Sequence, residues 1–76
     1  MYIKLSEMKV GAVGIIRSFE NTSSSIKLME MGCIPGEQIK IEKIAPLKDP
    51  ISILVAGYSL SLRLEEAENI VIEEII

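Results

Sequence analysis

Glycine and proline interrupt this chain at short intervals, and their spacing limits what it can fold into. Gly32 and the pair Pro35-Gly36 end one apolar segment, two prolines bound residues 45–50, and an alanine-glycine pair stands at 56–57. Glycine supplies left-handed backbone, while proline cannot continue a helix or donate a hydrogen bond within a sheet. No element between these positions can be long, so the sequence predicts short strands and tight turns.

Apolar residues at every second position indicate where the strands lie. Ile39 and Ile41 alternate with polar neighbours, and residues 51–55 carry β-branched side chains at alternate positions. This is the period of a strand with one buried face. The alternation slips near Lys43, which predicts a bulge or strong bend there. We expect five strands, around residues 13–19, 37–44, 51–55, 60–64 and 70–76.

A short helix is predicted over residues 25–31. Ile26 and Met29 lie three residues apart, as do Leu28 and Met31, so the helix carries two apolar pairs on neighbouring faces. A glycine follows directly and fits the left-handed position that ends many helices. The cysteine after that glycine is then expected to pack back on the helix.

These elements together predict the fold class. Single helical turns are expected at residues 5–11 and 64–69, the second ending on a left-handed Asn69. Five short strands with one or two short helices suit a mainly β fold, a small SH3-like barrel that hides most strand edges. Residues 1–76 are expected to form one domain, since 76 residues are few for more than one core.

Composition and charge exclude several classes of protein. Hydrophobic residues make up 49% of the chain and only three residues are aromatic, so the core is expected to be aliphatic. The net charge of −3 repels a phosphate backbone, and we expect no nucleic-acid partner. No apolar stretch approaches the roughly 20 residues of a membrane span, and the N-terminus lacks the apolar core of a signal peptide. We therefore expect a cytoplasmic protein without direct membrane insertion.

The residue types that carry enzyme chemistry are scarce. The chain has no histidine, which excludes Ser-His and Cys-His pairs, and no glycine is followed by lysine, which excludes a P-loop. Cys33 is alone, so it forms no internal disulfide, and it is either a small buried hydrophobe or a reactive thiol. Iron would find only oxygen ligands and one thiol. We expect no catalytic residue, no cofactor and no metal site.

The order of the motifs resembles the ferrous iron transport protein A (FeoA-like) family over nearly the whole chain. No single motif is specific, but the ordered series is. It departs mildly at Lys27, Met31 and Lys48, where arginine, leucine and glycine are common. The matching residues are Leu5 to Gly11, Ile15-Ile16, Leu28-x-x-Met31-Gly32-x-x-Pro35-Gly36, Ala45-Pro46, Asp49-Pro50, Gly57, Leu60-x-Leu62-Arg63 and Glu66-Ala67-x-x-Ile70-x-Ile72.

The resemblance implies a function. Members of this family are small cytoplasmic SH3-like domains, thought to work beside a membrane GTPase that admits ferrous iron. A member would be a noncatalytic accessory protein of ferrous iron uptake that binds and modulates the cytoplasmic part of that transporter. A similar fold occurs as the C-terminal domain of iron-dependent repressors, so the alternative is a soluble regulatory domain that binds another protein.

The helix at residues 25–31 and its exit form the candidate partner-binding surface. A small barrel needs some of these apolar side chains as a lid but need not bury both pairs. If Ile26 and Met29 stay partly exposed, they can dock a partner, and methionine adapts its shape readily to such a contact. In the other interpretation both pairs cap the barrel. The candidate partner-binding residues are Ile26, Met29, Ile34 and Pro35.

Overall fold

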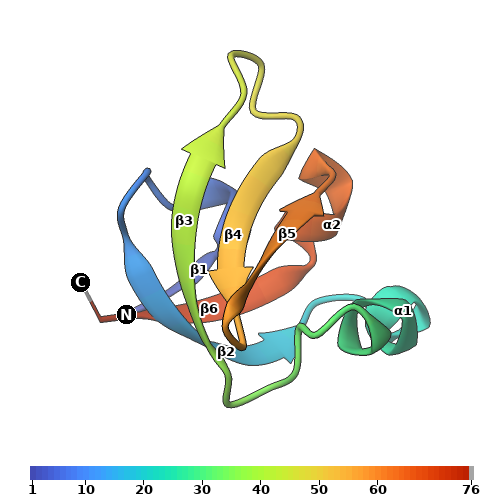
Figure 1. The fold of residues 1–76 in the computed structure, drawn as a ribbon. Coiled ribbons are helices and arrows are strands. Elements are labelled where there is room, and N and C mark those ends of the chain that lie inside the picture. The colour runs from blue at the N-terminus through green and yellow to red at the C-terminus, as the bar shows by residue number, and fades with distance from the viewer. Residues whose placement is uncertain (76) are drawn as a thin grey trace.

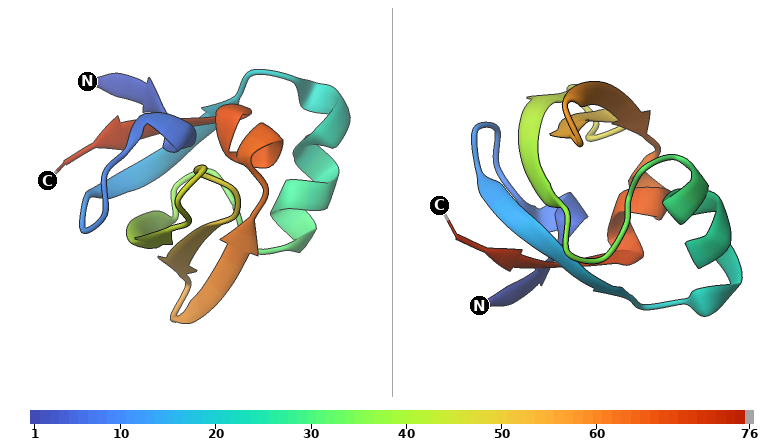
Figure 2. Two further views of the ribbon diagram at one scale, coloured as in Figure 1. Left: turned by 90° about the horizontal axis from the view of Figure 1, so that it is seen from above. Right: turned by 60° about the horizontal axis from the view of Figure 1, so that its bottom comes forward.

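A six-stranded antiparallel sheet curls into a small barrel in the computed structural model, which describes residues 1–75 (Figures 1 and 2). The strand order is β1-β6-β2-β3-β4-β5. The mainly β fold with short helices is confirmed. The strands are β1 (Tyr2–Lys4), β2 (Val13–Phe19), β3 (Gln38–Ile44), β4 (Ile51–Val55), β5 (Tyr58–Leu62) and β6 (Ile70–Glu74). The helices are η1 (Leu5–Glu7), η2 (Thr22–Ser24), α1 (Ser25–Glu30) and α2 (Leu64–Glu68).

The strand β1 is one more than the sequence predicted. It pairs with β6, with Tyr2 opposite Glu73 and Lys4 opposite Val71. Two of its three residues are exposed, so it carries no alternating apolar signal. Its strand conformation comes from pairing with residues about seventy positions away, which local pattern does not reveal. Residue 76, the end of the last expected strand, lies outside the described residues.

Two local predictions about the sheet are confirmed. The register of β3 against β4 shifts between Ile41 and Lys43, which is the expected bulge. The turn between β4 and β5 has positive φ at both Ala56 (51°) and Gly57 (85°). Positive φ at both turn residues gives the turn a backbone twist that matches the right-handed twist of the two strands. Such a two-residue turn therefore suits a hairpin.

The core is aliphatic and draws on almost every element. The inward residues of β3, β4 and β6 meet in the barrel, Leu28 enters from α1, and Ala67 enters from α2. Between β5 and β1, where the sheet has no hydrogen-bonded neighbour, α2 packs against η1. The buried hydrophobic residues are Leu5, Met8, Ile16, Leu28, Cys33, Ile39, Ile41, Ile51, Ile53, Val55, Leu62, Ala67, Ile70 and Ile72.

The end of α1 has the geometry that its sequence predicted. Gly32 is left-handed, with φ of 110°. Its N–H donates to the Met29 carbonyl at 3.0 Å, and the Cys33 N–H donates to the Leu28 carbonyl at 3.0 Å. This pair of bonds is a Schellman motif, which satisfies carbonyls that the helix end would leave free. It turns Cys33 back beside Leu28, and both side chains are buried.

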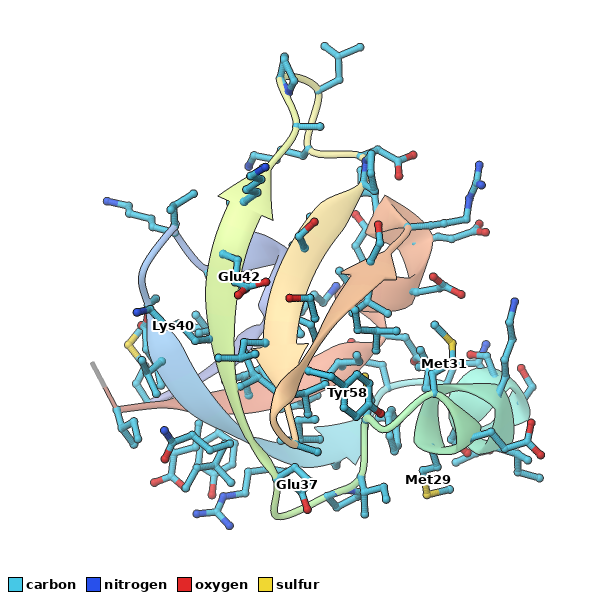
Figure 3. All side chains as sticks on the ribbon, viewed as in Figure 1. Met29, Met31, Glu37, Lys40, Glu42 and Tyr58 are labelled. Atoms are coloured by element: carbon cyan, nitrogen blue, oxygen red, sulfur yellow. The ribbon has the colours of Figure 1, made fainter. Side chains whose placement is uncertain are left out.

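The tyrosine Tyr58 of β5 fixes this helix end from across the fold. Its hydroxyl donates to the Met31 carbonyl at 2.8 Å (Figure 3). A Cβ placed on Gly32 would collide with the same hydroxyl. Two constraints therefore demand glycine at this position, since the backbone is left-handed and the space above it is filled.

The lone thiol belongs to the core. Cys33 is fully buried, and this burial, with a smaller contribution from the Glu66 charge, raises the pKa of its thiol to about 11. A thiolate is the nucleophilic form of cysteine, so a raised pKa suppresses its reactivity. Of the two interpretations of Cys33, the structure supports the small buried hydrophobe.

We predict that Gly32→Val destabilises the fold by more than about 1 kcal/mol, because a β-branched residue resists left-handed backbone. Gly36→Val is the matched control, since Gly36 has φ of 99° and no heavy atom within 4 Å of the place that a Cβ would take. The control bears only the backbone strain, so Gly32→Val should be the more destabilising in urea denaturation. If both variants lose the same free energy of unfolding, the collision with the Tyr58 hydroxyl adds nothing to the loss.

We predict that Ile41→Ala destabilises the fold by roughly 2–5 kcal/mol, because it leaves a cavity in a packed core. Ile41 is fully buried on β3, whereas Ile26 on α1 is mostly exposed. Ile26→Ala should change the free energy of unfolding by about 0.5 kcal/mol or less. Thermal or denaturant melts of both variants test the assignment, and a small loss for Ile41→Ala would contradict it.

We predict that stability falls in alkaline solution between the ordinary pKa of a thiol and about 11, the pKa of Cys33. The folded state holds the proton that the unfolded state releases there, so the raised pKa stabilises the fold at neutral pH and this contribution disappears as pH rises. Denaturant melts across this range should show a shallower decline for Cys33→Ala. An identical decline in both proteins would exclude Cys33 as the cause.

Candidate partner-binding surface

The helix α1 presents one apolar pair to solvent and turns the other inward. Leu28 is fully buried, and Met31 is partly buried against the core. Ile26 and Met29 are more exposed, with exposed fractions of 67% and 37%. Because a helix advances about 100° per residue, Ile26 lies about 160° around the helix from buried Leu28 and faces solvent, while Met29 lies about 100° from it, at the edge of the exposed face. Only one of the two apolar pairs therefore covers the barrel.

The other two predicted residues follow directly in the exit from α1. Ile34 is about half exposed and Pro35 is exposed. The Ile34 N–H donates to the Gly32 carbonyl and the Glu37 N–H donates to the Ile34 carbonyl, both at 3.0 Å. These bonds hold the turn in one shape. We call the four exposed residues the α1 surface: Ile26, Met29, Ile34 and Pro35.

An ion pair connects α1 to α2, the helix between β5 and β6. The Lys27 ammonium lies 3.6 Å from a carboxylate oxygen of Glu66 on α2. The other oxygen of Glu66 accepts a hydrogen bond from the Arg63 N–H at 2.8 Å, which caps the start of α2. Glu66 thus joins the two helices, although Lys27 is well exposed and an exposed pair adds little stability.

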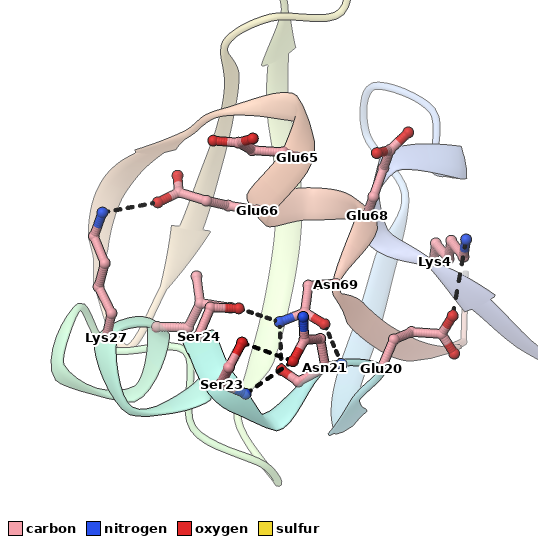
Figure 4. Close-up of a pocket in the computed structure, with 11 residues that line it drawn as sticks. Lys4, Glu20, Asn21, Ser23, Ser24, Lys27, Glu65, Glu66, Glu68 and Asn69 are labelled. Atoms are coloured by element: carbon pink, nitrogen blue, oxygen red, sulfur yellow. Dashed lines mark hydrogen bonds and ion pairs between the residues drawn. The ribbon is translucent and has the colours of Figure 1, made fainter.

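The residue Asn69 anchors the start of α1, a role that the sequence did not predict. The expected left-handed stop there is wrong, because its φ is −88°. Its side chain is buried, donates to the Asn21 carbonyl at 3.0 Å and to the Ser24 hydroxyl at 2.8 Å, and accepts from the Asn21 N–H (Figure 4). One signal was available: a polar residue stands between Ala67 and Ile70, both core residues.

A polar cleft of about 530 Å³ lies between the start of α1 and α2 (Figure 4). Its floor is the Asn69 network, and its rim holds more acidic than basic side chains. The polar groups at its base already form hydrogen bonds with one another. These bonds, made by Asn69, connect the start of α1 to the barrel. Its lining residues are Lys4, Glu20, Asn21, Ser23, Ser24, Lys27, Leu28, Glu65, Glu66, Glu68 and Asn69.

The described part of the chain, residues 1–75, offers contact surfaces and no grouped reactive side chains. It holds no group of three or more Cys, Asp or Glu residues arranged to bind a metal ion. Its buried side-chain nitrogen and oxygen atoms all have hydrogen-bond partners. None of its helices has the length and apolar character that a membrane crossing requires. Among its exposed large hydrophobic residues are Ile26, Met29 and Ile34.

Known proteins resemble this chain in sequence and in fold. The FeoA domain family matches residues 3–74. A curated relative from Porphyromonas gingivalis, named as a fusion of Fe(2+) transport protein A and Fe(2+) transporter FeoB, is 35% identical over 72 residues. The match covers 93% of this chain but 8% of that relative, so the chain spans a small part of the relative's length.

Two solved structures have a similar fold. The FeoA-like protein from Clostridium acetobutylicum is 36% identical, with a TM-score of 0.90 over 99% of this chain and 88% of that one. The zinc complex of FeoA from Stenotrophomonas maltophilia, described as an SH3 domain protein, has a TM-score of 0.78 over 93% of this chain and 89% of that one. At 24% identity this second likeness shows the fold alone, and it confirms the SH3-like class.

The matched residues include the glycine stop of α1, the proline loop and the last strand, so nearly every element described above lies inside the family's span. The chain therefore belongs to the FeoA domain family, a family of noncatalytic domains of ferrous iron transport.

Proposed function

We propose that this protein is a noncatalytic cytoplasmic accessory protein of ferrous iron uptake. It binds the cytoplasmic part of a membrane GTPase iron transporter and modulates it. The contact is made by the α1 surface. The observation that carries the proposal is that this surface exposes Ile26, Met29 and Ile34 on backbone held by the Gly32 turn.

The energetics favour a protein contact at this place. Exposed apolar side chains that lie together mark interaction sites, because contact removes their surface from water. Holding the backbone in its bound shape beforehand reduces the entropy lost on binding. The curated relative supports the choice of partner, since its name joins a transport protein A to a transporter FeoB within one chain.

Modulation follows from differential binding. A domain without catalytic groups can change a transporter only by binding one of its conformations more tightly than another. A tenfold preference corresponds to about 1.4 kcal/mol, which is within reach of two or three buried apolar side chains. Either direction of effect is consistent with the α1 surface, and the GTP hydrolysis rate reports which applies.

We predict that Met29→Asp weakens binding to the cytoplasmic part of the transporter by at least about tenfold, because it places a charge in an apolar contact. Leu54→Asp on β4 is the matched control, since Leu54 and Met29 are both 37% exposed. Titration calorimetry with the purified cytoplasmic part measures both affinities. The control should bind as the unchanged protein does, and equal weakening of both variants would exclude the α1 surface.

Loss of the protein should also change ferrous iron uptake in cells, and Met29→Asp should reproduce that change. Unchanged uptake at every iron level would argue against the proposal. Capture from cytosol and from solubilised membranes separates the two functions. Recovery of the transporter supports the accessory function, whereas recovery of a DNA-binding protein supports the alternative of a regulatory domain like those attached to iron-dependent repressors.

A further inference from the structure

The loop between β3 and β4 carries an apolar side chain far from the α1 surface. Leu47 at its apex is 86% exposed, more than any other large hydrophobic residue among those described. Figure 1 shows this loop projecting beyond the sheet, on the far side of the barrel from α1. The side chain of Leu47 has no part in the core, so it contributes little to the free energy of unfolding.

Hydrogen bonds hold this loop in one shape. The Lys48 N–H donates to the Ala45 carbonyl at 2.7 Å, and the Ala45 N–H donates to the Pro50 carbonyl at 3.2 Å. A carboxylate oxygen of Asp49 accepts from the Leu64 N–H at 3.2 Å, which ties the loop to α2. Leu47 therefore stands on a supported turn and would lose little backbone freedom on contact.

The foot of the loop is mainly apolar and basic, with one acidic side chain, Glu42. Val10, exposed at 61%, lines a shallow groove there with Ile44, Ala45 and Pro50. Lys43 lines the same groove, Lys48 follows Leu47, and Lys9 precedes Val10. We call this end the loop tip, defined by Lys9, Val10, Lys43, Leu47 and Lys48.

The charge at the loop tip differs from that of the whole chain. The net charge is −3, yet the loop tip contributes three lysines. None of these three takes part in the ion pairs of residues 1–75, which involve Lys4, Arg17 and Lys27. Two acids lie close by: Asp49 accepts a bond from the Leu64 N–H, and Glu42, which lines the same groove, accepts one from the Ser59 hydroxyl. By formal charge the three lysines outnumber these two acids.

We propose that the loop tip is a peripheral docking site for an anionic membrane surface, in which Leu47 enters the interface and Lys9, Lys43 and Lys48 contact anionic headgroups. Lysines near such a surface are attracted to it, whereas lysine is depleted in protein–protein interfaces. The convex shape of the loop also fits a membrane surface, because a protruding side chain can enter the lipid headgroup region without a complementary pocket. Charge complementarity thus favours lipid over a protein partner.

The contact between the loop tip and the membrane is weak, so it can assist attachment but cannot provide it alone. One apolar side chain with three lysines gives weak, reversible attachment, and stable attachment needs a second signal. Contact with a membrane-embedded partner would supply that signal and raise the effective concentration of each site for the other. The loop tip itself does not depend on the α1 surface, so either site can fail without the other.

We predict that a Leu47→Trp probe, in a chain without tryptophan, shifts its emission to shorter wavelength with vesicles of phosphatidylglycerol and phosphatidylcholine, but not with phosphatidylcholine alone. Lys43→Gln and Lys48→Gln should each weaken binding about fivefold, as expected for one lysine near an anionic surface. Ile34→Trp, on the α1 surface and about half exposed, is the control and should not shift.

Three outcomes would overturn the proposal. The first is an unshifted Leu47→Trp emission at millimolar lipid. The second is an equal shift with neutral vesicles, or in the Ile34→Trp control. The third is a shift that requires the cytoplasmic part of the transporter instead of lipid, which would make the loop tip a protein contact.

Discussion

The left-handed turn at Gly32 is the constraint on which the rest of the molecule depends. It ends α1 after six residues and reverses the chain, so that Cys33 lies beside Leu28 in the core. Once Leu28 is buried, helix geometry turns Ile26 toward solvent and places Met29 at the edge of the exposed face. The Tyr58 hydroxyl secures the same turn from β5. One backbone conformation thus sets both the stability of the helix and the surface that it offers.

Polar contacts and the burial of Leu28 together position α1 against the barrel. Leu28 is the fully buried residue of α1. The helix is otherwise held by the Asn69 network at its start, the Lys27–Glu66 pair along its side and the Tyr58 bond at its end. Buried hydrogen bonds such as those of Asn69 are costly to leave unmade, so they specify one position for the helix. An apolar surface on a positioned helix suits the binding function that we propose.

The two surfaces of this domain differ in chemistry and in place. The α1 surface is apolar and lies beside an acidic cleft. The loop tip is apolar at its apex and basic around its foot, on the other side of the barrel. A small barrel fills its interior with side chains, so its function lies on its exterior, and opposite ends of one rigid body can meet two different surroundings at once.

Local pattern determined much of this protein. The strands β3 and β4, their bulge, the turn at Ala56 and Gly57 and the glycine stop of α1 follow from alternation and turn chemistry, which act between residues near in sequence. The lack of histidine excluded Ser-His and Cys-His pairs. Only the tertiary structure decided that Tyr2–Lys4 form a strand, that Asn69 bonds Asn21, and that Tyr58 reaches Met31. The physical reason is distance along the chain: these contacts join residues 27 to about 70 positions apart, and no local propensity encodes them.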